Sequence, residues 1–236
     1  MIKGVAFDFD CTMYDRTGVW ERLSRSFLTR FGKNINHSLS ADAVLEILRQ
    51  GDAEGIANDN NWQGIFARYI KKGLFAAEPS FEEFFAFIEA EFPSAIVLRP
   101  DTMKCLQELK RMGMKTGIYT NGLSDYGRLK IRATGIDGLM DHILCSGDIN
   151  IEKPDARGFA VLAAGMGLQL EEIAFVGDHP KNDVLGAQNA GMTGIWIKAM
   201  VPWPGTIGAP EHSVKNLSEV VDLVSAMNSR ENAVGC

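Results

Sequence analysis

Short segments that are apolar at nearly every position recur along the chain. They cover residues 2–7, 116–119, 143–145, 173–176 and 194–197, and they stop at Asp8, Thr120, Ser146, Gly177 and Lys198. An unbroken apolar run of this length is typical of a parallel strand that is buried on both faces, whereas a half-exposed strand alternates. The pattern therefore predicts a parallel β-sheet whose strands end at polar or small residues.

Helical patterns alternate with these runs in the second part of the chain. They cover residues 100–112, 156–166, 182–190 and 216–227, and the first three stop at a glycine. A glycine just past the last turn is a common helix boundary, as is a proline in the first turn, and Pro100 has that place here. Alternation of strand and helix from about residue 98 predicts an α/β fold with a Rossmann-like, doubly wound sheet.

Residues 16–95 interrupt this alternation, because they contain no convincing strand. Apolar residues recur at helical spacing in the segments 20–31, 41–48, 62–70 and 81–92. Ser80 followed by Glu83 has the spacing of a capping box at the start of the last segment. We therefore expect a core formed by residues 1–15 and 96–236, with a helical domain of residues 16–95 inserted after the first strand. The Pro- and Gly-rich residues 199–213 are predicted to form a loop.

Composition and charge narrow the class of protein. The 236 residues are 46% hydrophobic and 23% charged, with a net charge of −6, which is typical of a globular protein. The acidic balance and the lack of a basic cluster exclude nucleic acid as the main partner. No apolar run approaches the ~20 residues that cross a bilayer, and the N-terminus shows no signal-peptide pattern. Four widely spaced cysteines (Cys11, Cys105, Cys145 and Cys236) fit reduced thiols. We expect a cytoplasmic enzyme without a nucleic-acid or membrane partner.

Polar residues gather where the predicted strands end. Asp8 and Asp10 follow the first strand, Thr120 and Asn121 the second, Lys153 comes after the third, and Asp178 and Asp183 follow the fourth. Because ligands bind at the carboxyl ends of the strands of an open parallel sheet, we expect these side chains to form one site.

The residue types at this rim indicate phosphoryl transfer. Carboxylates packed together repel one another, so they need a cation or raised pKa values. Oxygen ligands select a hard ion such as Mg²⁺, which usually takes one or two carboxylates together with water and phosphate. Lys153 and the Thr120 hydroxyl would then face an anionic substrate. Stabilising charge is most of the work in phosphoryl transfer, and a carboxylate can be the nucleophile.

The segments that follow the predicted strands, taken in chain order, resemble the four motifs of the haloacid dehalogenase superfamily. The matching residues are Asp8-Phe9-Asp10-Cys11-Thr12, then Thr120, then Lys153, then Gly177-Asp178 with Asp183 five residues on. The resemblance covers nearly the whole chain, and the helical insert is similar to the family's helical cap. Cys11 departs from the pattern, because the family usually has Gly at this tight turn.

The resemblance implies a role for each position. Asp8 would attack phosphorus and become an aspartyl phosphate, while Asp10 would act as general acid and then general base. Mg²⁺ would be held by Asp8, the Asp10 carbonyl and Asp178. The phosphate-binding groups would be Asp8, Thr12, Thr120, Asn121 and Lys153. Asp183 would orient Lys153 or a water on the metal.

The implied activity is Mg²⁺-dependent hydrolysis of a small phosphorylated metabolite. Asp10 favours phosphoester chemistry, because the dehalogenating members of the family lack this second carboxylate. Alternatives that stay open are a phosphomutase of the same family, a phosphonate or haloacid hydrolase, and a non-catalytic phosphate-binding or receiver-like protein. Tyr14, Arg16 and Trp20 are candidates for substrate contact, and His179 is expected to be a loop histidine rather than a ligand.

Overall fold

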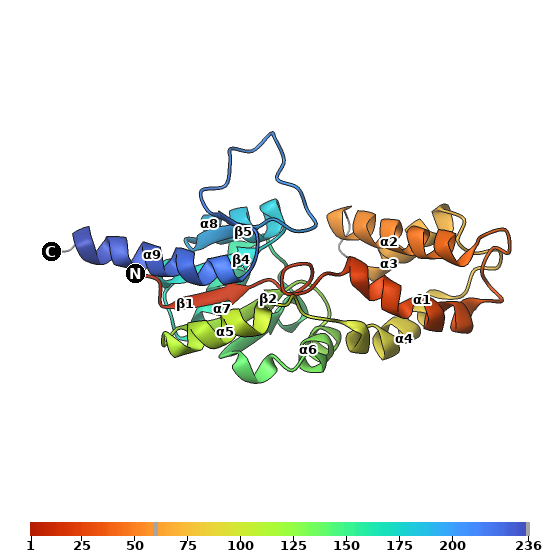
Figure 1. Ribbon diagram of the computed structural model, residues 1–236, viewed down its shortest axis with the longest axis horizontal. Helices are drawn as coiled ribbons and strands as arrows, with labels where there is room; N and C mark the ends of the chain where they lie inside the picture. Colours follow the sequence, from red (N-terminus) through yellow and green to blue (C-terminus); the bar gives the residue numbers. More distant parts are fainter. Residues whose placement is uncertain (59–60, 235–236) are drawn as a thin grey trace. The chain divides into compact units, whose positions relative to one another are not determined.

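The computed structural model describes residues 1–58 and 61–234, and the chain forms two compact units. We call Met1–Tyr14 together with Leu98–Cys236 the sheet unit, and Asp15–Val97 the helical unit. Figure 1 shows the elements of both units in the colours of the sequence.

Six parallel strands form the sheet, in the order β3-β2-β1-β4-β5-β6. They are β1 (Gly4–Phe7), β2 (Lys115–Thr120), β3 (His142–Cys145), β4 (Ile173–Gly177), β5 (Thr193–Ile197) and β6 (Ser213–Val214). The central strand β1 pairs with β2 on one side and β4 on the other, so Phe7 lies opposite Ile118 and Val176. This register brings the residues that follow β1, β2 and β4 to one edge of the sheet.

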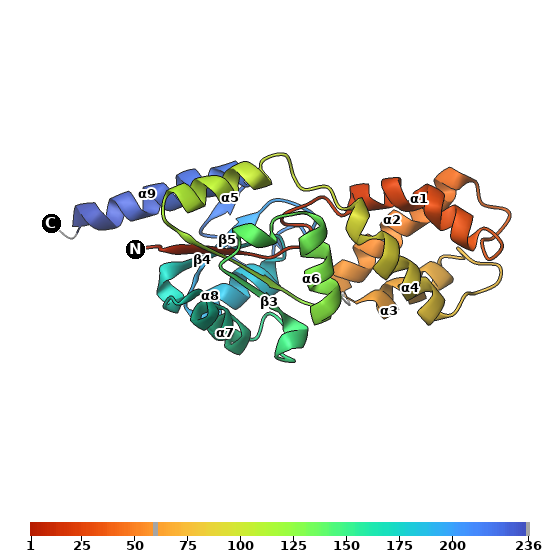
Figure 2. The ribbon, with the colours of Figure 1, turned by 90° about the horizontal axis from the view of Figure 1, so that it is seen from below.

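Helices cover both faces of this sheet. They are α5 (Thr102–Arg111), α6 (Ser124–Ala133), α7 (Ala156–Met166), α8 (Gly186–Ala190) and α9 (Ser218–Val234). Helices α5 and α9 lie side by side on one face, and α7 and α8 lie on the other (Figure 2). The prediction of a doubly wound α/β core is confirmed.

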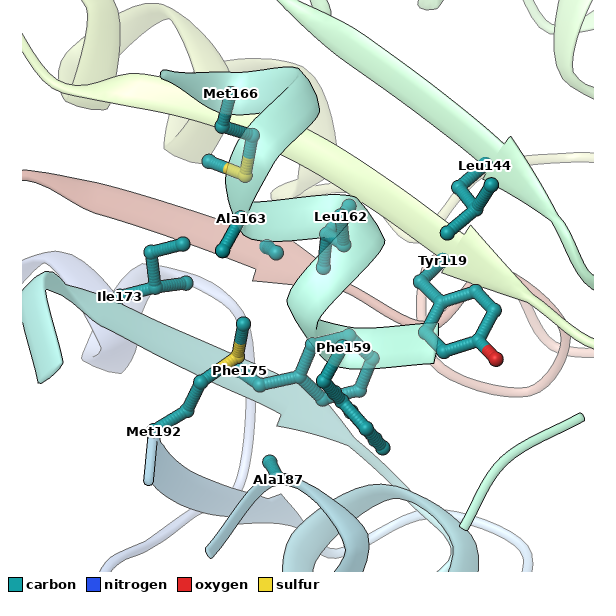
Figure 3. Packing of buried hydrophobic residues seen from close by; sticks show 11 residues of the cluster. Tyr119, Leu144, Phe159, Leu162, Ala163, Met166, Ile173, Phe175, Ala187 and Met192 are labelled. Carbon is teal, nitrogen blue, oxygen red and sulfur yellow. The ribbon is translucent and has the colours of Figure 1, made fainter. Parts of the chain in front are cut away.

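The apolar face of α7 forms one core of the sheet unit. Phe159 and Leu162 point from this helix towards the sheet, among side chains of β2, β3 and β4 (Figure 3). The Phe159 ring meets the rings of Tyr119 and Phe175 edge-on, with centroids 5.3 and 5.1 Å apart. Edge-to-face packing of this kind adds to the burial of apolar area and fixes the helix against the sheet.

Three elements differ from the sequence-based prediction. The predicted loop 199–213 ends in β6, because the backbone at Ser213 pairs with that at Trp196. The predicted helix 182–190 is a π-helical segment, Pro180–Leu185, followed by α8. Helix α6 was not predicted, since its sequence is polar and contains Gly127. That glycine allows close packing: a Cβ there would lie 2.7 Å from the Cys145 sulfur.

Among the described residues of the helical unit, four α-helices surround an aromatic core. They are α1 (Thr17–Phe31), α2 (Ala41–Asn58), α3 (Trp62–Lys71) and α4 (Phe81–Glu91). The predicted capping box is present, because Ser80 accepts from the Glu83 amide and the Glu83 carboxylate accepts from the Ser80 amide. Trp20 is fully buried and meets the rings of Phe27, Trp62, Tyr69 and Phe92 edge-on, with centroids 5.9–6.4 Å away.

An ion pair is buried in this aromatic core. The Arg16 guanidinium donates to both Asp52 oxygens, at 2.9 and 3.0 Å, and both side chains are almost fully buried. The same guanidinium lies 4.8 Å from the ring centroid of Trp62 and 4.9 Å from that of Phe92. A planar guanidinium suits both contacts, because it forks onto a carboxylate and stacks on aromatic faces.

Two further expectations concern membranes and cysteines. Within the residues that the structure describes, no helix is long and apolar enough to span a bilayer. The side chains of Cys11, Cys105 and Cys145 are buried, and Cys236 lies outside the described residues.

Candidate active site

Asp8 lies at the end of the central strand, where the chain leaves the sheet. Its amide still donates to the Val176 carbonyl of β4 at 2.9 Å, so the strand pairing fixes its position. Its side chain is only 10% exposed, and the Oδ1 atom accepts a hydrogen bond from the Lys153 ammonium at 2.7 Å. The sheet thus presents one carboxylate to one buried cation.

Lys153 bridges two carboxylates. Its Nζ lies 2.7 Å from Asp8 Oδ1 and 2.7 Å from Asp183 Oδ1. Burial lowers the pKa of Lys153, but the charges of Asp183 and Asp8 outweigh this and hold its pKa above the usual value. The Asn121 side chain fixes the lysine's backbone, because it accepts from the Lys153 amide at 2.9 Å and donates to the Lys153 carbonyl at 3.2 Å. The ammonium is therefore charged and held in place.

Asp178 completes an acidic cluster with an unsatisfied oxygen. Asp8, Asp178 and Asp183 each offer a carboxylate oxygen within 4.8 Å of the others. The Asp178 amide donates to Thr12 Oγ1 at 3.1 Å, and its carbonyl accepts from the Trp196 indole at 3.0 Å. Its buried Oδ2, in contrast, has no hydrogen-bond partner. A buried carboxylate oxygen without a partner costs free energy unless a ligand satisfies it.

The pKa values of this cluster point to a cation. Burial raises the pKa of Asp8 to about 7, against the Lys153 charge and with help from Asp183 and Asp10. Burial, followed by the charges of Asp183 and Asp8, raises the pKa of Asp178 well above its usual value. A nearby divalent ion stabilises the anionic form of carboxylates whose pKa values are otherwise raised. A set of ligands that are all oxygen atoms suits Mg²⁺. The donor set therefore fits this ion.

The hydrogen bonds separate Asp183 from the other two acids. Its Oδ1 accepts from Lys153 and its Oδ2 accepts from the His179 amide at 2.9 Å. Asp8 and Asp178 are thus better placed to bind a cation, whereas both carboxylate oxygens of Asp183 already accept hydrogen bonds. Gly177 makes room for this arrangement, because a Cβ there would lie 2.3 Å from the Asp183 Cβ.

Asp10 is held by two donors that sequence analysis did not bring together with it. The Tyr14 hydroxyl donates to Asp10 Oδ1, and the Lys130 ammonium lies 2.5 Å from Oδ2. Lys130 is 5% exposed and comes from α6. The signal was present in the spacing: Tyr126, Gly127, Lys130 and Ile131 form the buried face of this helix. Because α6 was not predicted, the sequence analysis gave Lys130 no place in the site.

The turn after β1 is fixed from the other side by Arg99. Its guanidinium donates to the carbonyls of Cys11 at 2.8 Å and Thr12 at 3.0 Å. Cys11 has a φ of 64°, which lies in the left-handed region that Gly adopts most easily. The cysteine thus takes the backbone conformation for which the family's usual Gly is best suited. The turn holds Asp10 two residues after Asp8.

The remaining candidate residues lie partly at the site and partly away from it. Thr120 ends β2 and is 2% exposed. The Thr12 hydroxyl, which is expected at phosphate, contacts Asp178 in the structure. Of the three candidates for substrate contact, Tyr14 binds Asp10, while Arg16 and Trp20 pack inside the helical unit. His179 is half-buried, and its Nδ1 accepts from the Asn182 amide at 3.2 Å. Burial lowers the pKa of this imidazole.

Comparison with known proteins identifies the class. The model of the haloacid dehalogenase-like hydrolase family matches residues 2–191. The chain therefore belongs to the haloacid dehalogenase-like hydrolases, as the motifs predicted, and it is a hydrolase of this class.

Its curated relatives include phosphatases. The glyceraldehyde 3-phosphate phosphatase of Methanocaldococcus jannaschii is 28% identical over 231 residues, which cover 95% of this chain and 97% of the relative. A phosphoserine phosphatase of Thermus thermophilus is 34% identical over 123 residues, covering 52% of this chain and 49% of the relative.

Solved structures share the fold. An HAD phosphatase from Thermococcus onnurineus has a TM-score of 0.68 at 24% identity, covering 94% of this chain and 98% of that one. The L-2-haloacid dehalogenase of Xanthobacter autotrophicus has a TM-score of 0.72 at 21% identity, covering 96% and 100%. Phosphatases and dehalogenases thus share this architecture, and the site must distinguish them.

Proposed function

We propose that the protein hydrolyses a small phosphomonoester with Mg²⁺, through an aspartyl phosphate on Asp8. The observation that carries the proposal is the pair of carboxylates on one turn: Asp8 beside a buried ammonium, and Asp10 held separately by Lys130 and Tyr14. Departure of an alkoxide needs a proton and departure of a halide does not, so the second carboxylate favours phosphoester chemistry. The phosphatase names of the curated relatives support the same class.

In this proposal Asp8 is the nucleophile. One of its oxygens forms a bond to phosphorus while the bond to the ester oxygen breaks, and Asp10 gives its proton to that oxygen. In the second step Asp10 takes a proton from water as the water oxygen attacks phosphorus and the Asp8 carboxylate leaves. Lys153 stays 2.7 Å from Asp8 and offsets the charge of the incoming phosphate.

Asp8, the Asp10 carbonyl and Asp178 would hold the Mg²⁺. The unsatisfied Oδ2 of Asp178 and the raised pKa values of Asp8 and Asp178 support this assignment. When bound, the ion supplies positive charge that offsets the charges of the carboxylates and the phosphate. Thr120 and the amides after β2 are proposed to bind phosphate oxygens. The helical unit is proposed to serve as the family's cap.

Phosphate release from a panel of small esters tests the proposal. The panel includes glyceraldehyde 3-phosphate and phosphoserine, because curated relatives carry these names. We expect release that needs Mg²⁺, stops with chelator and is lost in Asp8→Asn. Asp222→Asn, which changes an exposed aspartate of α9, is the matched control and keeps the activity. A folded wild type that releases no phosphate from any ester, or an active Asp8→Asn, would contradict the proposal.

A further inference from the structure

Lys130 is a buried lysine whose ammonium points at Asp10. It lies on α6, ten residues after Thr120, and its side chain is 6% exposed. The Nζ is 2.5 Å from Asp10 Oδ2, and it lies 5.6 and 5.3 Å from the ring centroids of Phe9 and Tyr126. Its carboxylate partner is thus a residue of the candidate site, and its surroundings are aromatic.

Stability alone gives a poor reason for this arrangement. Burying an ammonium costs hydration free energy, and a buried ion pair is often no more stable than apolar side chains of similar volume. Ordering a lysine side chain adds a further cost in lost rotamer entropy. A lysine in the last turn of a helix could instead extend into solvent, where it would still favour the helix dipole. The inward orientation therefore calls for a function at Asp10.

Two donors on two oxygens fix the orientation of a carboxyl group. Lys130 occupies Asp10 Oδ2 and Tyr14 occupies Oδ1. Tyr14 is fully buried, and its ring packs on Phe9 with centroids 5.2 Å apart, so this second donor is also held firmly. Neither rotation of Asp10 about its side-chain bonds nor exchange of its two oxygens is possible without breaking one of these contacts.

We propose that Lys130 is a positioning residue for the acid–base step, holding the Asp10 carboxyl group where it exchanges a proton with the leaving oxygen. This inference rests on the proposed function. Lys130 itself gives and takes no proton: the bonds that form and break are those at phosphorus, and the proton moves between Asp10 and the leaving oxygen. A displacement of about 1 Å at such a group can cost roughly 100-fold in rate.

The test compares esters whose leaving groups differ in their need for a proton. For an alkyl phosphate, where the alkoxide must be protonated, Lys130→Met is expected to lower kcat/KM about 10- to 100-fold. For p-nitrophenyl phosphate, whose phenolate leaves without a proton, the loss should stay below about threefold. The ratio kcat/KM is the right readout, because it covers steps up to departure of the leaving group and excludes the later attack by water.

Matched variants separate positioning from folding. Lys104→Met changes an exposed lysine on α5 and should leave both esters unaffected. Lys130→Arg keeps a cationic donor and should regain part of the loss on the alkyl phosphate. Tyr14→Phe removes the hydroxyl that donates to the other oxygen of Asp10, so it should show the same dependence on the leaving group even if Lys130→Met does not fold. In an Asp10→Asn background, Lys130→Met should cost nothing further.

The outcomes are distinct. Equal losses of Lys130→Met on both esters, or no loss on either, would overturn the inference while the proposed function stands. If Lys130→Met does not fold and Tyr14→Phe shows equal losses, the inference also fails. A folded wild type that releases phosphate from no ester, the panel above included, would overturn the proposed function and this inference with it.

Discussion

Replacing Lys153 by methionine should destabilise the sheet unit in a pH-dependent way. The ammonium touches two buried carboxylates at 2.7 Å each, and at an effective dielectric constant near 20 each contact is worth about 6 kcal/mol before the cost of burial. Burial of the charges offsets most of this attraction. Removing one partner of a buried pair typically costs about 3–5 kcal/mol, and we expect a loss of this size at pH 8 without metal.

The loss should shrink at low pH, because Asp8 then binds a proton. Its pKa is about 7 in the folded protein, so at pH 5.5 the wild type has already lost one of the two ionic contacts of Lys153. We expect the destabilisation at pH 5.5 to be smaller by about 1–2 kcal/mol, since one pKa unit corresponds to about 1.4 kcal/mol.

Urea unfolding in the presence of chelator measures this difference. Hydrogen exchange of the β1 peptide is the readout, so that the result refers to the sheet unit. Lys3→Met is the control. Lys3 forms an exposed ion pair with Glu172, and its removal should change the free energy of unfolding little at either pH. A loss for Lys153→Met that is equal at both pH values, or below about 1 kcal/mol at pH 8, would refute the reasoning.

Three further predictions concern stability. With chelator present, the raised pKa of Asp8 means that the folded state binds more protons than the unfolded state between pH 4 and 7. The free energy of unfolding should therefore fall by up to about 4 kcal/mol as the pH rises from 4 to 7. Urea titrations at several pH values measure this change. Arg16→Met leaves Asp52 buried without its partner and should cost about 3–5 kcal/mol, with much of the loss recovered by adding Asp52→Leu, as measured by thermal unfolding. Gly177→Ala would place a Cβ 2.3 Å from that of Asp183, so it should lower both the unfolding midpoint and the Mg²⁺ affinity measured by calorimetry.

The sheet was predictable from sequence because its strands are buried on both faces. The run before Asp8 is apolar at nearly every position and becomes β1, and the polar residues that end it lie at the edge where neighbouring strands also end. The contact between Lys153 and Asp8 follows from this topology, although 145 positions separate the two residues. Topology can be inferred from a pattern of strands and helices, and it places strand ends together.

Side-chain partners were less predictable, because they depend on helix packing. Helix α6 has a polar sequence, so the burial of Lys130 follows from tertiary contacts that the local pattern does not encode. The contact of the Thr12 hydroxyl with Asp178, which is 166 positions away, is likewise not visible in the motif. The π-helical segment after His179 depends on backbone contacts that apolar periodicity does not show.

Trapping the covalent intermediate tests the central claim most directly. Wild type and Asp8→Asn would be mixed with a labelled phosphomonoester and Mg²⁺, quenched in acid during turnover, reduced with borohydride and mapped by mass spectrometry. The account predicts a covalent phosphate whose reduction converts Asp8 of the wild type to homoserine, with no modification in Asp8→Asn. Phosphate release without conversion of Asp8 to homoserine, or with the modification at another residue, would contradict it.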